Sequence, residues 1–317
     1  MSQPQDVRAQ HERPSSRPLA CAIILNYFGA AMTGRCVAKL GPEGLSRIIV
    51  ADNSADSVEW KKLQKECEEL RPQLAGVDVV LVQSPRNLGF GKAINAAIHG
   101  ELDHGRIHPY FLLINNDAEA KPGCVPRLIA ALEHNPHAAL ASPAIESLGT
   151  RHCFRWYKRF FGHHTTRPLR WAFPYLTGCC LLVRGSVAAE EPLFDEAFFM
   201  YGEDIDLSWR QTRKGRPLLC IEDAVVVHEG RGSTGRVSFF YEYHLNRGQL
   251  LLARRAVRHK WEIPAMLLGR LCYLGARAAV RSLRFRSATP LAGFVASWSR
   301  RRVSPEPNSV AEGASGR

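Results

Sequence analysis

Short apolar runs that end at polar residues recur through the first half of the chain. They cover residues 19–25, 47–51, 77–82 and 111–114. Runs of this length, bounded by polar residues, are typical of strands buried on both faces of a parallel sheet. Segments with helical spacing separate them, at 31–40, 58–70 and 92–99. This alternation predicts an α/β fold with a Rossmann-like, mostly parallel, doubly wound sheet and helices on both faces.

Polar side chains gather where these predicted strands end. Asp52 follows one strand, and Asp117 follows another with Glu119 two residues later. In open α/β sheets, ligands bind at the carboxyl ends of the strands. Carboxylates there suit Mg²⁺ or Mn²⁺ and the phosphates that such an ion neutralises. The alternative is that Asn116-Asp117 only turns the chain, and that Asp52 only caps a helix.

A glycine-containing segment, 86–91, joins the third predicted strand to the helix at 92–99. Glycine allows close backbone approach, and the N–H groups at a helix N-terminus favour phosphate. The spacing is not G-x-G-x-x-G, so the fingerprint of dinucleotide-binding proteins is absent.

The second half of the chain contains an acidic and aromatic segment, 194–210. Five acids lie in it, among Phe, Met and Tyr: Asp195, Glu196, Glu203, Asp204 and Asp206. Favourable interaction with a helix dipole explains acids in a first turn. It does not explain so many acids among aromatics, where a carboxylate has the raised pKa that suits a general base.

Three other features lie in this half. Residues 151–171 are rich in Arg, His and aromatics, and we expect either a loop that contacts an anionic or sugar-bearing acceptor or a solvated insertion. A strand is predicted at 177–183, with Gly178 where a substrate approaches. The last predicted strand, 218–227, delivers His228, which either is structural or completes a metal site.

The charge of the chain is concentrated near its C-terminus. Residues 254–302 contain twelve Lys and Arg against one acid and so account for +11 of the net charge of +12. Within 261–298, the residues Arg270, Arg277, Arg281 and Arg284 share one helical face, and no window of about 18 uncharged apolar residues occurs. We expect a basic amphipathic helix on an anionic membrane surface rather than one packed on the core. Nucleic acid is not expected as a partner, because no recognition fold accompanies the charge.

The nine cysteines are scattered and include no C-x-x-C pair, so we expect buried thiols in a reducing cytosol. The N-terminus lacks the apolar core of a signal peptide. Residues 1–18 and 303–317 are expected to be disordered tails.

Seven segments in combination resemble the family 2 glycosyltransferases of the GT-A fold, and among them bacterial rhamnosyltransferase-like members. They are IILNYFG, VADNSAD, NLGFGKAIN, LLINNDAE, GCCLLVRG, FDEAFFMYGEDIDLSWR and VVVHEGRGS. Together they extend from Ala22 to about Asn246. The resemblance implies an inverting, metal-dependent transfer of a sugar from a nucleotide-diphospho-sugar.

The resemblance also implies roles for individual residues. Contacts to the donor nucleotide fall on Asn26, Tyr27, Asp52, Asn53, Asn87, Gly89, Lys92 and Asn116. The metal, Mg²⁺ or Mn²⁺, falls to Asp117, with His228 as a possible second ligand. The family's D-x-D is written here with a single Asp, so either Glu119 or Asn115 completes the site. Asp204, beside Glu203, is the expected catalytic base, and the acceptor or sugar pocket is expected at Gly178, Tyr201 and Trp209.

The expected organisation is a nucleotide-sugar-binding half at 19–150, an acceptor-binding and catalytic half at 151–250, and a basic helical membrane-surface segment at 251–302. The expected activity is transfer of rhamnose from dTDP-rhamnose to a cell-surface glycan or a polyprenyl-diphosphate-linked acceptor. It is expected on the cytoplasmic face of the inner membrane of a bacterium. The alternatives are a UDP-hexose or UDP-N-acetylhexosamine donor, a nucleotide-binding module without catalysis, and a nucleic-acid-binding protein.

Overall fold

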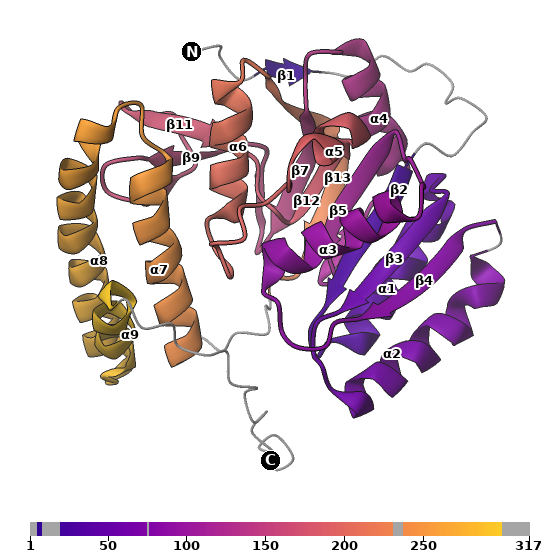
Figure 1. Ribbon diagram of the computed structural model, residues 1–317, viewed down its shortest axis with the longest axis horizontal. Helices are drawn as coiled ribbons and strands as arrows, with labels where there is room; N and C mark the ends of the chain where they lie inside the picture. Colours follow the sequence, from indigo (N-terminus) through magenta and orange to yellow (C-terminus); the bar gives the residue numbers. More distant parts are fainter. Residues whose placement is uncertain (1–4, 8–19, 75, 231–236, 300–317) are drawn as a thin grey trace.

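A computed structural model describes residues 5–7, 20–74, 76–230 and 237–299. A ten-stranded mixed sheet lies at its centre (Figure 1). The main path runs β1 (Gln5–Val7), β13 (Leu218–His228), β7 (Leu140–Ser147), β12 (Cys180–Arg184), β5 (Tyr110–Asn115), β2 (Ala20–Asn26), β3 (Arg47–Asp52), β4 (Asp78–Gln83). Two short strands pair off this path, β6 (Ala118–Ala120) with β13 and β8 (Thr150–His152) with β7. Strands β5, β2, β3 and β4 are mutually parallel, whereas β12 is antiparallel to both of its neighbours.

The register of the parallel strands brings their polar ends to one edge. Asn26 lies opposite Asp52, and Asp52 lies opposite Gln83. On the other side of β2, Leu25 lies opposite Asn115, two residues before Asp117. The polar strand ends predicted from the sequence therefore share one edge of the sheet.

Helices cover both faces of this sheet. They are α1 (Ala30–Leu40), α2 (Ser57–Leu70), α3 (Phe90–Asp103), α4 (Cys124–His134), α5 (Gly185–Glu190) and α6 (Glu203–Arg213), with short 3₁₀ turns η1 (Gly41–Glu43) and η2 (Arg71–Gln73). One buried apolar cluster joins α1, α2 and α4 to the sheet, and a second joins α3 and α5. Because the two clusters use alternate residues of the same strands, such as Ile24 and Ile23 of β2, they lie on opposite faces. The predicted doubly wound arrangement is confirmed.

A second, three-stranded antiparallel sheet lies where the sequence predicted a loop or an insertion. It consists of β9 (Arg155–Lys158), β10 (His163–Thr165) and β11 (Ala172–Tyr175) in the order β10-β9-β11. Tyr157 and Phe173 of this sheet are buried in a third apolar cluster with Trp209 of α6 and Leu252. The aromatic residues of this segment thus attach the small sheet to the rest of the domain.

Three C-terminal helices follow β13: α7 (Phe239–Arg255), α8 (Ile263–Phe285) and α9 (Thr289–Trp298), with the 3₁₀ turn η3 (Lys260–Glu262) before α8. The three pack against one another at one side of the molecule, away from β4 and α2 (Figure 1). The predicted outward basic face of α8 is wrong: Arg270 is fully buried, and Arg277 and Arg281 both pair with the buried carboxylate of Glu242 on α7.

Length and apolar composition alone would let one described helix cross a membrane, Lys260–Phe285. This differs from the expectation from the sequence, in which the arginines within 261–298 argue against a spanning segment.

Two further expectations are corrected. Cys153 and Cys220 form a disulfide, so the nine cysteines are not all thiols, and Cys272 is exposed rather than buried. The pairing joins the segment after β8 to β13 across 67 residues, which no spacing in the sequence indicates. Gln5–Val7, inside the predicted N-terminal tail, pairs as a strand with β13; the rest of that tail, and 303–317, lie outside the described residues.

Candidate functional site

A buried polar network occupies the carboxyl ends of β2 and β3. The Asn26 side-chain amide donates to Asp52 Oδ1 at 3.1 Å and to Glu59 Oε1 at 3.2 Å. Asn26 Oδ1 in turn accepts from the Thr33 hydroxyl at 2.8 Å. Because buried polar groups are costly unless they are hydrogen-bonded, this network fixes the two strand ends relative to each other.

Asp52 lies at the centre of the network and is fully buried. Its carboxylate also accepts from the Ser54 backbone N–H and hydroxyl and from the Gln83 side-chain amide at 3.2 Å. Both oxygens of Asp52, which was predicted to bind the nucleoside, therefore already accept hydrogen bonds from other residues of the protein. Tyr27, whose pKa is raised by partial burial, and Gln83 are the more accessible groups at this end of the sheet.

A second set of contacts shapes the glycine-containing segment before α3. Asn53 donates to Asn87 Oδ1 at 2.8 Å and accepts from the Leu88 N–H at 2.8 Å. Gly89 has a φ of 81°, and a Cβ there would lie 2.3 Å from the Phe199 carbonyl oxygen. Only glycine fits this close approach. It brings the predicted donor loop against the acidic segment, as does the Lys92–Glu196 ion pair at 2.9 Å.

Asp117 and His228 are brought together by strand pairing. In the antiparallel ladder of β6 and β13, Ala118 lies opposite His228, so the residue before Ala118 meets the end of β13. His228 Nε2 lies 3.2 Å from Asp117 Oδ1. Hydrogen bonding to Asp117 and to Cys179 raises the pKa of His228 to about 10. Asp117 and His228, which the sequence suggested as two ligands of one metal site, are therefore in contact.

Glu119 is placed differently from Asp117. Its carboxylate lies 3.5 Å from Arg35, which also pairs with Glu229 at 3.0 Å. Asn116 donates to the Thr33 hydroxyl at 3.1 Å. The Asp117 carboxylate is an oxygen ligand that suits Mn²⁺ or Mg²⁺, and His228 would act as a second ligand after losing its proton to the solvent, whereas Glu119 is already neutralised by a guanidinium. The residues present thus fit a divalent cation held by Asp117 and His228.

The acidic segment places Asp204 at the start of α6. Gly202, at a φ of 105°, forms the turn before the helix. Asp204 Oδ2 accepts from the Gly178 N–H at 3.0 Å, and Oδ1 accepts from the Ile205 N–H at 2.8 Å. A Cβ on Gly178 would be 3.6 Å from Asp204 Cβ, so the two residues predicted for this site are neighbours. Burial raises the pKa of Asp204, and the two N–H donors oppose that shift.

Whereas Asp204 is partly exposed, Glu203, the residue before it, is buried. Within the described part of the chain, its Oε2 atom has no hydrogen-bond partner. Burial, and then repulsion from Asp204, raise its pKa to about 8. Two neighbouring carboxyls, one of them buried, do not readily ionise together, so we expect the buried Glu203 to hold the proton while Asp204 is the base.

This pair has a consequence for stability. Glu203 binds its proton more tightly in the folded protein than in the unfolded chain, because its pKa is raised on folding. The stability that this proton adds is therefore present at low pH and is lost as the pH rises from about 4.5 to about 8. Glu203→Gln should therefore raise the free energy of unfolding at pH 9 by on the order of 2 kcal/mol relative to the parent. At pH 4 the free energy of unfolding should be little changed, because Glu203 is protonated there in both states. Urea unfolding at both pH values measures this. An equal effect at both would contradict it.

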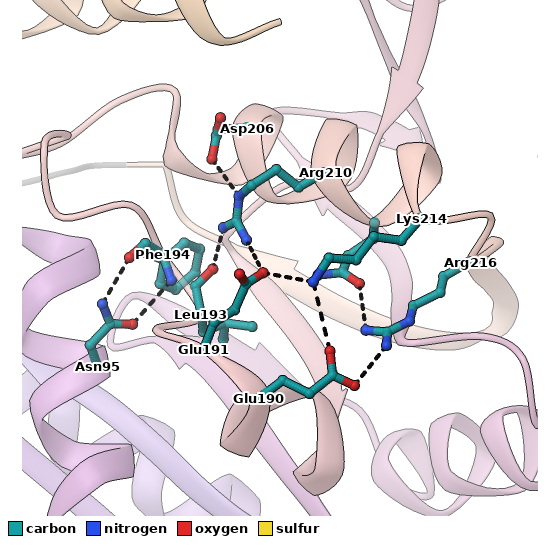
Figure 2. Close-up of polar contacts among 10 residues, drawn as sticks. Asn95, Glu190, Glu191, Leu193, Phe194, Asp206, Arg210, Lys214 and Arg216 are labelled. Carbon is teal, nitrogen blue, oxygen red and sulfur yellow. Dashed lines mark hydrogen bonds and ion pairs between the residues drawn. The ribbon is translucent and has the colours of Figure 1, made fainter.

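A polar cluster behind the acidic segment holds it against α6 (Figure 2). Arg210 donates to the Leu193 carbonyl and pairs with Asp206 at 2.8 Å and with Glu191 at 3.0 Å. Farther along, Lys214 and Arg216 pair with Glu190. On the other side, Asn95 of α3 makes two hydrogen bonds to the backbone of Phe194. The segment that carries Asp204 is therefore fixed to both halves of the domain.

The remaining predicted pocket residues are placed unequally. Tyr201 is partly exposed and packs edge-on to Tyr241, with ring centroids 5.4 Å apart. Trp209 is instead buried in the third apolar cluster, 4.8 Å from Phe173 between ring centroids. The prediction that Trp209 lines a pocket is wrong; it attaches α6 to the small sheet.

Arg155 on β9 is a site residue that sequence reasoning missed. Its positive charge lowers the pKa values of Asp204 and Tyr175, against the larger effect of burial, which raises both. Its Nε atom is buried without a hydrogen-bond partner in the described residues. A guanidinium with an unpartnered donor suits a substrate oxygen anion. The Arg-rich composition of 151–171 was the available signal, but it did not single out one arginine.

Comparisons with known proteins agree with this geometry. The family model described as glycosyl transferase family 2 matches residues 21–190. Two curated relatives, each named N-acetylglucosaminyl-diphospho-decaprenol L-rhamnosyltransferase, come from two strains of Mycobacterium tuberculosis, CDC 1551 / Oshkosh and ATCC 25618 / H37Rv. Each is 30% identical over 192 residues, which are 50% of this chain and 61% of the relative. The alignment thus spans less than two thirds of the relatives' length.

Two solved structures share the fold. The mannosyltransferase PcManGT from Pyrobaculum calidifontis, in complex with GDP-Man and Mn²⁺, has a TM-score of 0.58 at 12% identity. The aligned region covers 95% of the present chain and 92% of the mannosyltransferase chain. GalNAc-T7 with UDP, GalNAc and Mn²⁺ has a TM-score of 0.58 at 15% identity. The aligned region covers 74% of the present chain and 48% of the GalNAc-T7 chain. Both are GT-A glycosyltransferases, and the chain described here is a glycosyltransferase that belongs to family 2.

Proposed function

We propose that this glycosyltransferase moves rhamnose from dTDP-rhamnose to a polyprenyl-diphosphate-linked glycan, with inversion and with a divalent metal. The location proposed is the cytoplasmic face of a bacterial inner membrane. The observation that carries the proposal is the partly buried Asp204 carboxylate, held by the Gly178 N–H on a segment that packs against the donor loop. The names of the curated relatives support the sugar and the lipid-linked acceptor.

In this proposal, Asp204 takes the proton of the attacking acceptor hydroxyl. The acceptor oxygen forms a bond to the anomeric carbon as the bond from that carbon to the nucleoside diphosphate breaks, and the centre inverts. A raised pKa suits Asp204 to this task, because a base with a pKa nearer to neutral binds the proton more strongly. The N–H donors of Gly178 and Ile205 hold the carboxylate in place.

Asp117 and His228 would hold the metal ion. Such an ion, when bound, neutralises charge on the departing diphosphate. The chain's own contribution at the donor end is the positioning of Tyr27, Asn87 and Gly89 by the buried network around Asn26, Asp52 and Asn53. Of the predicted donor residues, Lys92 faces Glu196 in this arrangement and would have to exchange that partner to reach a phosphate.

We assign Arg155 to the acceptor, because its unpartnered Nε is a donor for an anionic group such as a diphosphate and its charge acts on Asp204. The small antiparallel sheet then serves as the acceptor platform, a role that the sequence left open for 151–171.

The experiment is a donor screen by calorimetry with purified protein. dTDP-rhamnose, UDP-glucose, UDP-galactose and UDP-N-acetylglucosamine are each titrated with Mn²⁺, Mg²⁺ or chelator. We expect the tightest binding for dTDP-rhamnose with metal, weakened by chelator. Preference for a UDP-sugar would replace the proposed donor, and binding to none of them by folded protein would contradict the proposal.

A further inference from the structure

Three of the four arginines of α8, namely Arg270, Arg277 and Arg281, face the protein rather than the solvent. Arg270 donates to the Gln249 carbonyl at 3.2 Å and to the Tyr157 hydroxyl at 2.8 Å. Arg277 and Arg281 each lie 2.7 Å from an oxygen of Glu242, which is itself fully buried on α7. These cations satisfy buried acceptors, so they fix one face of α8 to the catalytic domain.

The opposite face of α8 is apolar throughout. Leu268 is 61% exposed, Val280 is 63% exposed and Leu283 is 80% exposed. Every exposed residue between 263 and 283, all of which are described, is uncharged: Pro264, Ala265, Leu268, Leu271, Cys272, Ala276, Ala279, Val280 and Leu283. Leu291 and Val295 of the adjoining α9 are exposed as well. A continuous apolar stripe of this kind marks an interaction surface.

Cations and aromatics flank the stripe at both ends. Trp261 is 75% exposed beside the exposed Lys260 at the start of α8, and Arg284 and Arg286 are exposed at its end. An apolar face of roughly 34 Å, from a 23-residue helix at about 1.5 Å per residue, is bordered by groups that favour the lipid headgroup region.

This charge arrangement decides between two occupants. If two copies paired through the stripe, cations would meet cations whether α8 ran parallel or antiparallel to its partner, because both ends are positive. An anionic bilayer complements both ends at once. We propose that the exposed face of α8 and α9, from Trp261 to Leu283 with Leu291 and Val295, inserts into the interfacial layer of an anionic phospholipid bilayer.

The helix lies in the membrane plane and does not cross it. Spanning would place Arg270, Arg277 and Arg281 in hydrocarbon, where charged side chains are costly. It would also strip Glu242 of both partners. The inference deepens the membrane location proposed above, and it requires no particular donor sugar.

The test is flotation of the purified full chain with vesicles of phosphatidylcholine alone or with 30% phosphatidylglycerol. We expect binding to the anionic vesicles and weaker binding to the neutral ones. The double variant Leu268→Glu/Leu283→Glu should bind at least roughly tenfold more weakly, because it removes two apolar side chains and adds like charge to the surface. The matched control is Ile107→Glu, an 86% exposed apolar residue outside this surface. It should bind as the parent does.

Thermal unfolding establishes that the double variant is folded, as expected for exposed positions. Binding that the double variant retains, or equal binding to neutral vesicles, would overturn the inference. So would light scattering that shows a dimer of the parent which the double variant loses, since a second copy would then cover the face. Protein that stays with vesicles after an alkaline carbonate wash would show a spanning helix instead. Because none of these assays contains a donor, their failure is separable from failure of the proposed reaction.

Discussion

Asp204→Asn should lower the rate of sugar transfer by roughly 10²- to 10⁴-fold, the usual contribution of a general base. An Asn side chain keeps the size of the group and can still accept from the Gly178 N–H, but it cannot take a proton. Donor binding measured by calorimetry should therefore be unchanged. The measurement is initial rate with saturating donor and acceptor.

The control for this variant is Asp195→Asn, which changes another acid of the same segment. Asp195 pairs with Arg255 and accepts from the Ala197 N–H, away from Gly178. Its loss should leave most of the activity. Transfer that survives in Asp204→Asn, or a loss of donor binding along with transfer, would count against Asp204 as the base.

Asp117→Ala should weaken metal-dependent donor binding by about 100-fold or more, since even residues that only support a metal ligand commonly contribute 10- to 100-fold. The reason is that Asp117 is the buried carboxylate in contact with His228, and no other acid shares that contact in the described residues. Mn²⁺ binding followed by electron paramagnetic resonance, with dTDP present, gives a readout apart from catalysis.

Glu119→Gln is the matched comparison for Asp117→Ala. Because Glu119 is paired with Arg35, the variant should lower Mn²⁺ affinity far less. If the two variants weakened Mn²⁺ binding equally, Glu119 would contribute to holding the ion as much as Asp117 does. If Asp117→Ala kept its full metal dependence, Asp117 would not be a ligand.

Much of the central sheet followed from the sequence, because buried parallel strands have a local signature. An apolar run that stops at Asp52 or Asn115 gives both the strand and the end at which ligands bind. Parallel register then requires neighbouring ends to meet, so the proximity of Asn26, Asp52 and Asn53 could be expected. The acidic segment was also recognisable, since acids among aromatics are uncommon without a reason.

The features that the sequence did not predict depend on partners distant in the chain. Periodicity correctly placed Arg270, Arg277 and Arg281 on one face of a helix, but it could not say which way that face points. The direction is set by Glu242, which is 35 residues from Arg277 and 39 from Arg281. In the same way, Trp209 is buried because Phe173 of the unpredicted sheet packs on it, and Cys153 meets Cys220 through the tertiary fold alone.

The most direct test of the proposed reaction is the stereochemistry of a single transfer. Purified protein is incubated with dTDP-rhamnose, Mn²⁺ and a short-chain polyprenyl diphosphate that carries N-acetylglucosamine, and the product is characterised by NMR. The proposal predicts a rhamnosyl product with the anomeric configuration opposite to that of the donor, formed by the parent and not by Asp204→Asn. A product with retained configuration would contradict single displacement with Asp204 as the base.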